Sequence, residues 1–93
     1  MSLEMYGNKL AMSCPICEKA FSGIAGLIQH WISEDIIDDI KEHWIDGKFE
    51  LVFYLSKNSK FAKFSLVVQD NLKVVFLKEI LSKERHAREV SRW

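Results

Sequence analysis

Two cysteines and a histidine near the start of the chain limit what this sequence can fold into more than any other feature does. Cys14 and Cys17 are separated by two residues, and twelve residues then pass before His30. A short hairpin followed by two helical turns needs about this length to bring a histidine back over a pair of cysteines. Two thiolates and an imidazole suit a borderline-soft cation such as zinc, so the spacing predicts a metal site.

The same stretch resembles a zinc finger of the two-cysteine, two-histidine type. Phe21 and Leu27 stand where that family places the two residues of its small core. The resemblance covers residues 14–30, and it implies cysteines on a hairpin, a histidine on a helix and zinc as the cofactor. Glu34 and Asp35 stand where the last histidine of the family belongs, so the sequence departs from the pattern at the fourth ligand.

Several residues compete for this fourth ligand position. His43 has suitable chemistry, and it is the leading candidate if the chain breaks near Ser33 and folds back. Glu34 follows the first histidine by one helical turn and is the alternative, although carboxylates are uncommon in closed zinc sites. The remaining candidates are Asp35, His86, a second chain and water.

Other roles for the cysteine pair stay open. A C-x2-C pair can be a redox centre of the glutaredoxin kind, but such a pair stands at the start of a long helix. Here residues 21–23 would interrupt that helix within six residues of the pair. The two cysteines can also be ordinary core residues, which the gap to His30 disfavours. Nothing else in the chain indicates an oxyanion site or a substrate pocket. We therefore expect a binding protein with no enzymatic activity and no small-molecule substrate.

Hydrophobic periodicity predicts an α+β fold in a single domain, residues 1–93. Residues 10–33 form the zinc-finger-like unit, whose helix is expected to start after Ser22. An acidic amphipathic helix is expected over residues 34–47, because four apolar side chains recur there at helical spacing: Ile36, Ile37, Ile40 and Trp44. Gly47 is expected to end this second helix.

The remainder of the chain is predicted to form first a sheet and then a helix. Residues 48–77 predict an antiparallel hairpin or a three-stranded meander, because apolar side chains alternate along 48–56 and the KNSK segment at 57–60 suits a turn. The last strand is expected to end at about Leu77. A basic helix is expected over residues 78–92.

Charge is divided unevenly along the chain. Residues 1–47 carry eight acidic side chains and three lysines, a balance of −5, whereas residues 48–93 carry ten basic and five acidic side chains, a balance of +5. Such a division favours either a basic surface for an anionic partner or two halves that attract one another. The residues expected to contact nucleic-acid phosphates are Arg85, Arg88, Arg92, Lys57, Lys60 and Lys63.

The finger helix itself is poorly suited to reading DNA. Gly23, Gly26 and Gln29 occupy the three base-reading positions, and two of them have no side chain. We therefore predict a zinc-stapled regulator of transcription that associates with nucleic acid and uses its finger structurally. The alternative is a protein-interaction or dimerisation module that uses the apolar finger helix. The apolar runs are too short to span a bilayer, so we expect an intracellular, cytoplasmic protein without membrane contact.

Overall fold

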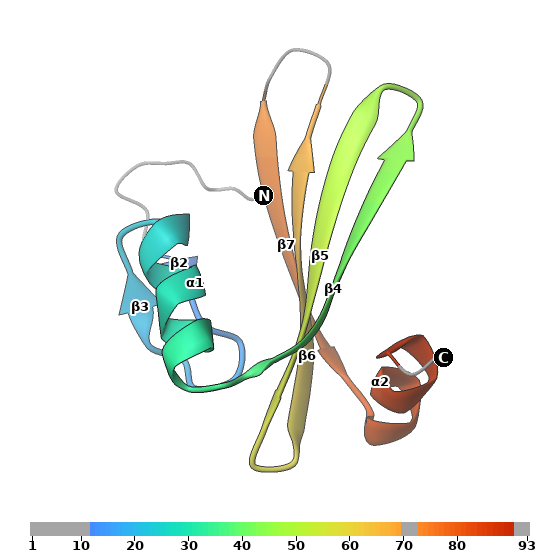
Figure 1. Ribbon diagram of the computed structural model, residues 1–93. Helices are drawn as coiled ribbons and strands as arrows, with labels where there is room; N and C mark the ends of the chain where they lie inside the picture. Colours follow the sequence, from blue (N-terminus) through green and yellow to red (C-terminus); the bar gives the residue numbers. More distant parts are fainter. Residues whose placement is uncertain (1–11, 70–72, 91–93) are drawn as a thin grey trace.

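The computed structural model describes residues 12–69 and 73–90, and it begins with a small ββα unit. We call this the finger unit. It consists of strands β2 (Met12–Ser13) and β3 (Ala20–Phe21) and helix α1 (Ile24–Ser33). The finger unit lies beside a long sheet, toward one end of its strands (Figure 1).

The sheet has four antiparallel strands in the order β4-β5-β6-β7, so every strand pairs with its neighbour in sequence. The strands are β4 (Ile37–Ile45), β5 (Lys48–Lys57), β6 (Lys60–Val68) and β7 (Val74–Leu81). Two-residue turns, Asp46–Gly47 and Asn58–Ser59, join the first three strands, and all four turn residues have positive φ. Two consecutive left-handed residues form a type I′ turn, whose twist matches that of the flanking strands.

Side-chain alternation gives the sheet two different faces. On the finger-side face, Phe53 of β5 and Phe64 of β6 pack against Trp31 of α1, with ring centroids 5.2 Å apart in both pairs. The opposite face carries Val52 and Tyr54 and is covered by helix α2 (Lys83–Val90). The larger hydrophobic core therefore lies between the finger unit and the sheet.

The acidic helix predicted over residues 34–47 is wrong, because this segment forms edge strand β4. A spacing of four, as between Ile40 and Trp44, equals two strand repeats as well as about one helical turn, so the pattern could not discriminate. A bulge between Ile37 and Asp39 also disturbs the strand alternation. The Asp46–Gly47 pair, interpreted as a helix end, is in fact the hairpin turn.

The expected fold is corrected at two further places. The last strand continues to Leu81, so residues 78–81 belong to the sheet and not to the basic helix. Helix α1 has Gly23 as its N-cap in place of Ser22. The molecule is thus mostly antiparallel sheet with two short helices, and its N-terminal half, residues 1–47, contains one helix among the described residues in place of the expected two.

The C-terminal helix begins later than the sequence suggested. Ser82 caps it, because the Ser82 hydroxyl accepts a hydrogen bond of 3.1 Å from the backbone N–H of Arg85. Arg92, assigned to this helix from the sequence, lies outside the described residues. Neither of the two described α-helices is long and apolar enough to cross a membrane.

Candidate metal centre

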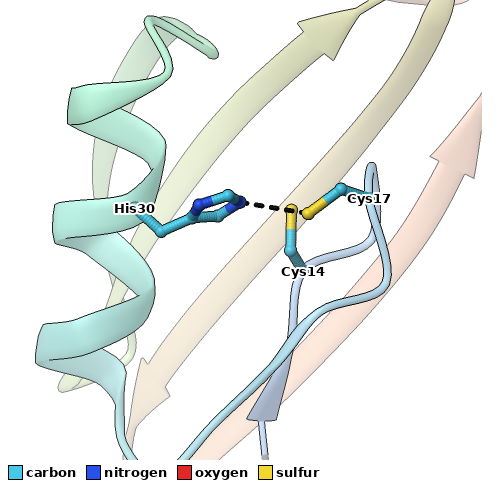
Figure 2. Close-up of side chains that lie close together, drawn as sticks. All are labelled: Cys14, Cys17 and His30. Carbon is cyan, nitrogen blue, oxygen red and sulfur yellow. Dashed lines mark hydrogen bonds between the residues drawn. The ribbon is translucent and has the colours of Figure 1, made fainter.

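Cys14 and Cys17 lie in a tight loop that joins β2 to β3. Two backbone hydrogen bonds close the loop, from Cys14 N–H to the Lys19 carbonyl at 2.9 Å and from Glu18 N–H to the Cys14 carbonyl at 2.8 Å. Glu18 is left-handed, with φ of 66°, which lets the chain reverse within so few residues. The loop presents both sulfur atoms toward α1 (Figure 2).

His30 points from α1 at this loop. Its Nε2 lies 3.1 Å from Cys17 Sγ, and Phe21 packs beside the imidazole with ring centroids 5.0 Å apart. The ligand atoms of Cys14, Cys17 and His30 all lie within 4.8 Å of one another (Figure 2). Bonds of about 2.0 to 2.3 Å to tetrahedral zinc would place ligand atoms a little under 4 Å apart. The three groups thus fit around one ion with small adjustments.

Cys14 is the buried member of the group, with no exposed surface. Its sulfur accepts hydrogen bonds from Trp31 Nε1 at 3.3 Å and from the backbone N–H of Ile16 at 3.4 Å. Such donors around a sulfur orient it and suit the electron-rich thiolate of a metal site. Because Trp31 also fills the main core, the metal site and the core share a side chain.

The C-terminal end of α1 positions Glu34 beside the site. The N–H of Ile36 bonds to the Trp31 carbonyl at 2.9 Å, and the N–H of Asp35 bonds to the Ile32 carbonyl at 3.1 Å. With Asp35 at φ of 56°, this is a Schellman motif. It turns the chain into β4 and leaves Glu34 at the helix end, on the same side as the site.

The structure does not bring either distant histidine to the site. His43 is exposed on β4 opposite Glu50, six residues beyond Ile37 and therefore about 20 Å further along the strand. His86 lies on the α2 face, where its Nε2 is 2.8 Å from a carboxylate oxygen of Asp38. Neither residue belongs to the group of candidate ligands.

A cavity of about 340 Å³ opens in front of the site. Its lining includes two of the candidate ligands, Cys17 and His30, one carboxylate and three lysines: Glu34, Lys19, Lys57 and Lys60. Glu34 forms an ion pair with Lys57, which lowers the pKa of the Glu34 carboxyl and raises the pKa of the Lys57 ammonium. Glu34 is thus engaged by a lysine and stands outside the three-residue group.

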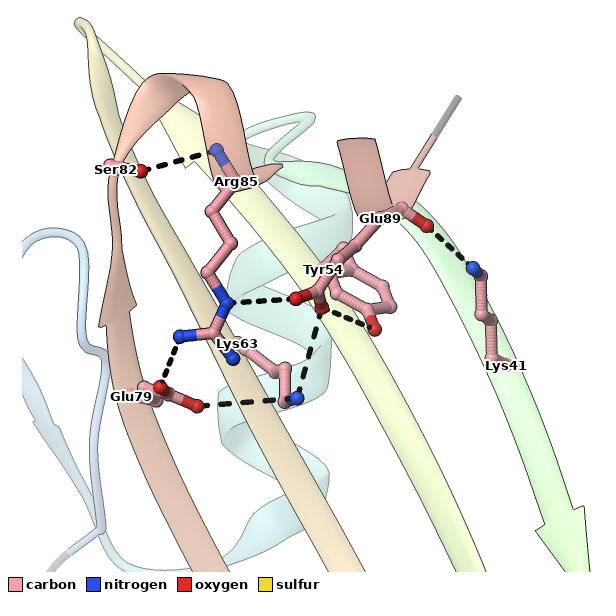
Figure 3. Close-up of polar contacts among 7 residues, drawn as sticks. All are labelled: Lys41, Tyr54, Lys63, Glu79, Ser82, Arg85 and Glu89. Atoms are coloured by element: carbon pink, nitrogen blue, oxygen red, sulfur yellow. Dashed lines mark hydrogen bonds and ion pairs between the residues drawn. The ribbon is translucent and has the colours of Figure 1, made fainter. Parts of the chain in front are cut away.

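Some of the basic residues expected to contact phosphate form ion pairs with described carboxylates, and others do not. Lys57 pairs with Glu34 at the β5–β6 turn. On the opposite face, Arg85 binds Glu79 at 2.6 Å and Glu89 at 2.8 Å, and Lys63 lies within 4.0 Å of the same two carboxylates (Figure 3). Lys60 and Arg88 are exposed.

A polar network around Tyr54 was not predicted from the sequence. The Tyr54 hydroxyl donates a hydrogen bond of 3.1 Å to Glu89, and the ammonium of Lys41 lies 5.3 Å from the Tyr54 ring centroid (Figure 3). Burial, and then the contact with Glu89, raise the pKa of Tyr54 to about 12. The hydrogen bond from Arg85 lowers the pKa of Glu89. No sequence pattern joins residues so far apart in the chain.

Comparison of the chain with protein-family models, with curated proteins and with solved structures found no match. The resemblance to a two-cysteine, two-histidine finger therefore rests on residues 14–30 alone. What the structure adds is a candidate metal site of two thiols and one imidazole, held together by a loop and a helix.

Proposed function

We propose that this protein is a zinc-stapled interaction module that pairs with a second copy of itself through its sheet. In this proposal zinc holds the finger unit, the finger unit supports one end of the sheet, and the other end makes the contact with the partner. The observation that carries this proposal is an apolar surface on the finger-side face, beyond the finger unit. In Figure 1 the strands run well past α1 at this end.

This surface, which we call the open face, consists of two rows across the strands. The register places Trp44, Phe49, Val68 and Val74 in one row and Glu42, Leu51, Leu66 and Phe76 in the next, so seven of the eight side chains are apolar. Trp44 is 72% exposed and Val74 is 44% exposed, and the rings of Trp44 and Phe49 lie 4.7 Å apart. Contiguous apolar patches of this kind mark interaction sites more often than scattered apolar residues do.

A second copy is the partner that suits the open face. Its only charged side chain is Glu42, which lies on edge strand β4 and is exposed, so two copies can meet through the seven apolar side chains with this carboxylate at the rim of the contact. The chain has a formal net charge of zero, which also removes long-range repulsion between copies. Two stacked sheets would bury both apolar rows at once, as in a β-sandwich.

Sedimentation analysis over a range of protein concentrations tests self-association. We expect the native chain to form dimers, and we expect Trp44→Arg to raise the dimer Kd by about thirtyfold or more, the effect of losing a central aromatic contact. Leu77→Arg is the matched control, because Leu77 is 54% exposed but lies on the other face of β7. A native chain that stays monomeric, or equal effects of the two variants, would contradict the proposal.

The zinc staple is tested separately by metal analysis and chelation. Protein purified without chelator should contain one zinc per chain, and removing it should unfold the finger unit, because structural zinc supplies about 10–16 kcal/mol in finger peptides. Amide exchange should then rise in α1 before it rises in β5 and β6. A finger unit that stays protected without metal would refute the staple.

Nucleic-acid binding, the function that the sequence favoured, is the second candidate. It is supported by Lys60 and Arg88, which form no ion pair with any residue in the described part of the chain. Because Lys57, Lys63 and Arg85 already have carboxylate partners, phosphates would have to compete for them. A gel-shift titration at two salt concentrations tests this candidate, since phosphate contacts give a steep salt dependence.

A further inference from the structure

The candidate metal site has one side that no described residue of the chain fills. Cys14 lies on the inner side, fully buried and bonded to Trp31. Cys17 and His30 line the cavity in front of the site. An ion held by these three groups would therefore be reached from the cavity, where a fourth ligand could bind it.

The carboxylate that lines this cavity already has a partner. Glu34 lines the cavity, but its oxygen accepts a hydrogen bond from Lys57, and its carboxylate is not among the ligand atoms that lie within 4.8 Å of one another. To become the fourth ligand, Glu34 would have to leave Lys57 and move toward the ion. The arrangement described here keeps Glu34 in the wall of the cavity.

The charge around the cavity favours an anion. Two thiolates neutralise a divalent ion, and Glu34 neutralises Lys57, whereas Lys19 and Lys60 have no ion-pair partner among the described residues. Two positive charges therefore remain in the lining of the cavity. A volume of about 340 Å³ accommodates a small anionic group together with water.

We propose that the cavity is a binding site for an oxyanion, a carboxylate or a phosphate group, that completes the metal coordination. One oxygen of the anion takes the fourth corner, and the other oxygens accept hydrogen bonds from Lys19 and Lys60. Anionic oxygens bind both zinc and lysine ammonium groups well, so the two parts of the site select the same ligand. The inference rests on the proposed metal site and adds a ligand to it.

Cobalt(II) substitution provides the test, because tetrahedral cobalt has visible absorption bands that respond to each of its ligands. Inorganic phosphate and acetate are titrated separately into the cobalt-loaded protein. We expect a saturable spectral change with at least one of them. A response to acetate alone identifies carboxylate as the ligand class, and a response to phosphate alone identifies phosphate.

Two lysine variants show whether the cavity is responsible. Replacing both Lys19 and Lys60 with Met should weaken anion binding about tenfold or more, since two charge-assisted contacts are lost. Replacing both Lys48 and Lys83 with Met removes the same charge from surfaces outside the cavity and should leave the affinity unchanged. Equal weakening in the two double variants would overturn the proposal.

Glu34→Gln distinguishes the open corner from a closed site. If the corner is open, this variant keeps the starting cobalt spectrum and still responds to the anion. If Glu34 is the fourth ligand, the starting spectrum changes in the variant and the native protein does not respond, which overturns the oxyanion site but leaves the zinc staple intact. Failure of the chain to bind cobalt or zinc would overturn both.

Discussion

The two helices are attached to the two faces of one sheet by different chemistry. Helix α1 is held through Leu27 and Trp31, both fully buried among aromatic and aliphatic side chains, and it carries His30 of the candidate metal site. Helix α2 is held by a smaller apolar contact at Val90 and by several polar groups, with His86 beside Asp38 and with Glu89 beside Tyr54 and Lys41. The first attachment rests on apolar packing and includes the candidate metal site, and the second relies more on charge.

This difference predicts different sensitivities. Burial of apolar surface is insensitive to salt and pH, whereas exposed ion pairs are screened and titrate. Arg85 and its partner Glu79 are both more than one third exposed, so their contact adds little in salt. We expect the finger unit to respond to chelators and core substitutions, and α2 to respond to pH and ionic strength.

The largest expected effect is on the finger side. Trp31→Ala should lower the free energy of unfolding by about 3–5 kcal/mol, because it empties a large buried volume and removes the hydrogen bond to Cys14. His86→Ala on the other face should cost about 1–3 kcal/mol. Urea unfolding of both zinc-loaded variants measures the difference. Equal losses would abolish the contrast between the faces, and Trp31→Phe serves if the alanine variant does not fold.

A smaller effect is expected on the α2 face at high pH. The pKa of Tyr54 is raised from 10.0 to about 12, so the folded state favours the neutral phenol. The stability that this provides is complete below pH 10 and is lost as the pH rises from 10 to about 12. Unfolding free energies measured across this range should fall more steeply for the native chain than for Tyr54→Phe. Parallel curves would show that Tyr54 does not couple α2 to pH.

The smallest effect is a gain in the finger unit. Gly26 lies inside α1, and a methyl group there would meet Phe21 Cδ2 at 3.6 Å, an ordinary contact. Gly26→Ala should therefore stabilise the protein by about 0.5–1 kcal/mol and raise the Tm by about 2–6 °C. Gly23→Ala is the control, because Gly23 is the N-cap, where alanine is unfavourable. Calorimetry that shows a loss for Gly26→Ala would indicate a tighter contact with Phe21.

The parts of the fold that sequence could predict are those encoded locally. The alternation in β5 and the turn at Asn58–Ser59 predicted the hairpin with β6 because both signals come from adjacent residues. In β4 the signals conflicted, since a bulge and a spacing of four imitated a helix. Pairing with β5 makes residues 37–45 a strand and not a helix, and the residues of this segment alone do not reveal that pairing. The N-cap at Ser82 was not predicted, although serine is a favoured N-cap residue.

In the candidate site, too, only the part that is encoded locally could be predicted. Cys14, Cys17 and His30 are joined by one hairpin and one helix, so their spacing determined their proximity. The fourth position depended on the path of the chain after Ser33. Once that path became a strand, His43 was carried away from the site. The lysines around the cavity come from the β2–β3 loop and from the adjoining ends of β5 and β6, and only the tertiary structure brings them together.

The sequential order of the four strands bears on how the chain folds in time. Every strand contacts its immediate successor, so the sheet forms through short loop closures and should assemble rapidly. The finger unit is synthesised first, yet the surface that covers Leu27 and Trp31 includes Phe53 and Phe64, which are synthesised later. During this interval a bound metal ion can keep the nascent finger unit compact. An ion at the candidate metal site would then decide whether the unit waits for the sheet in a compact or an unfolded form.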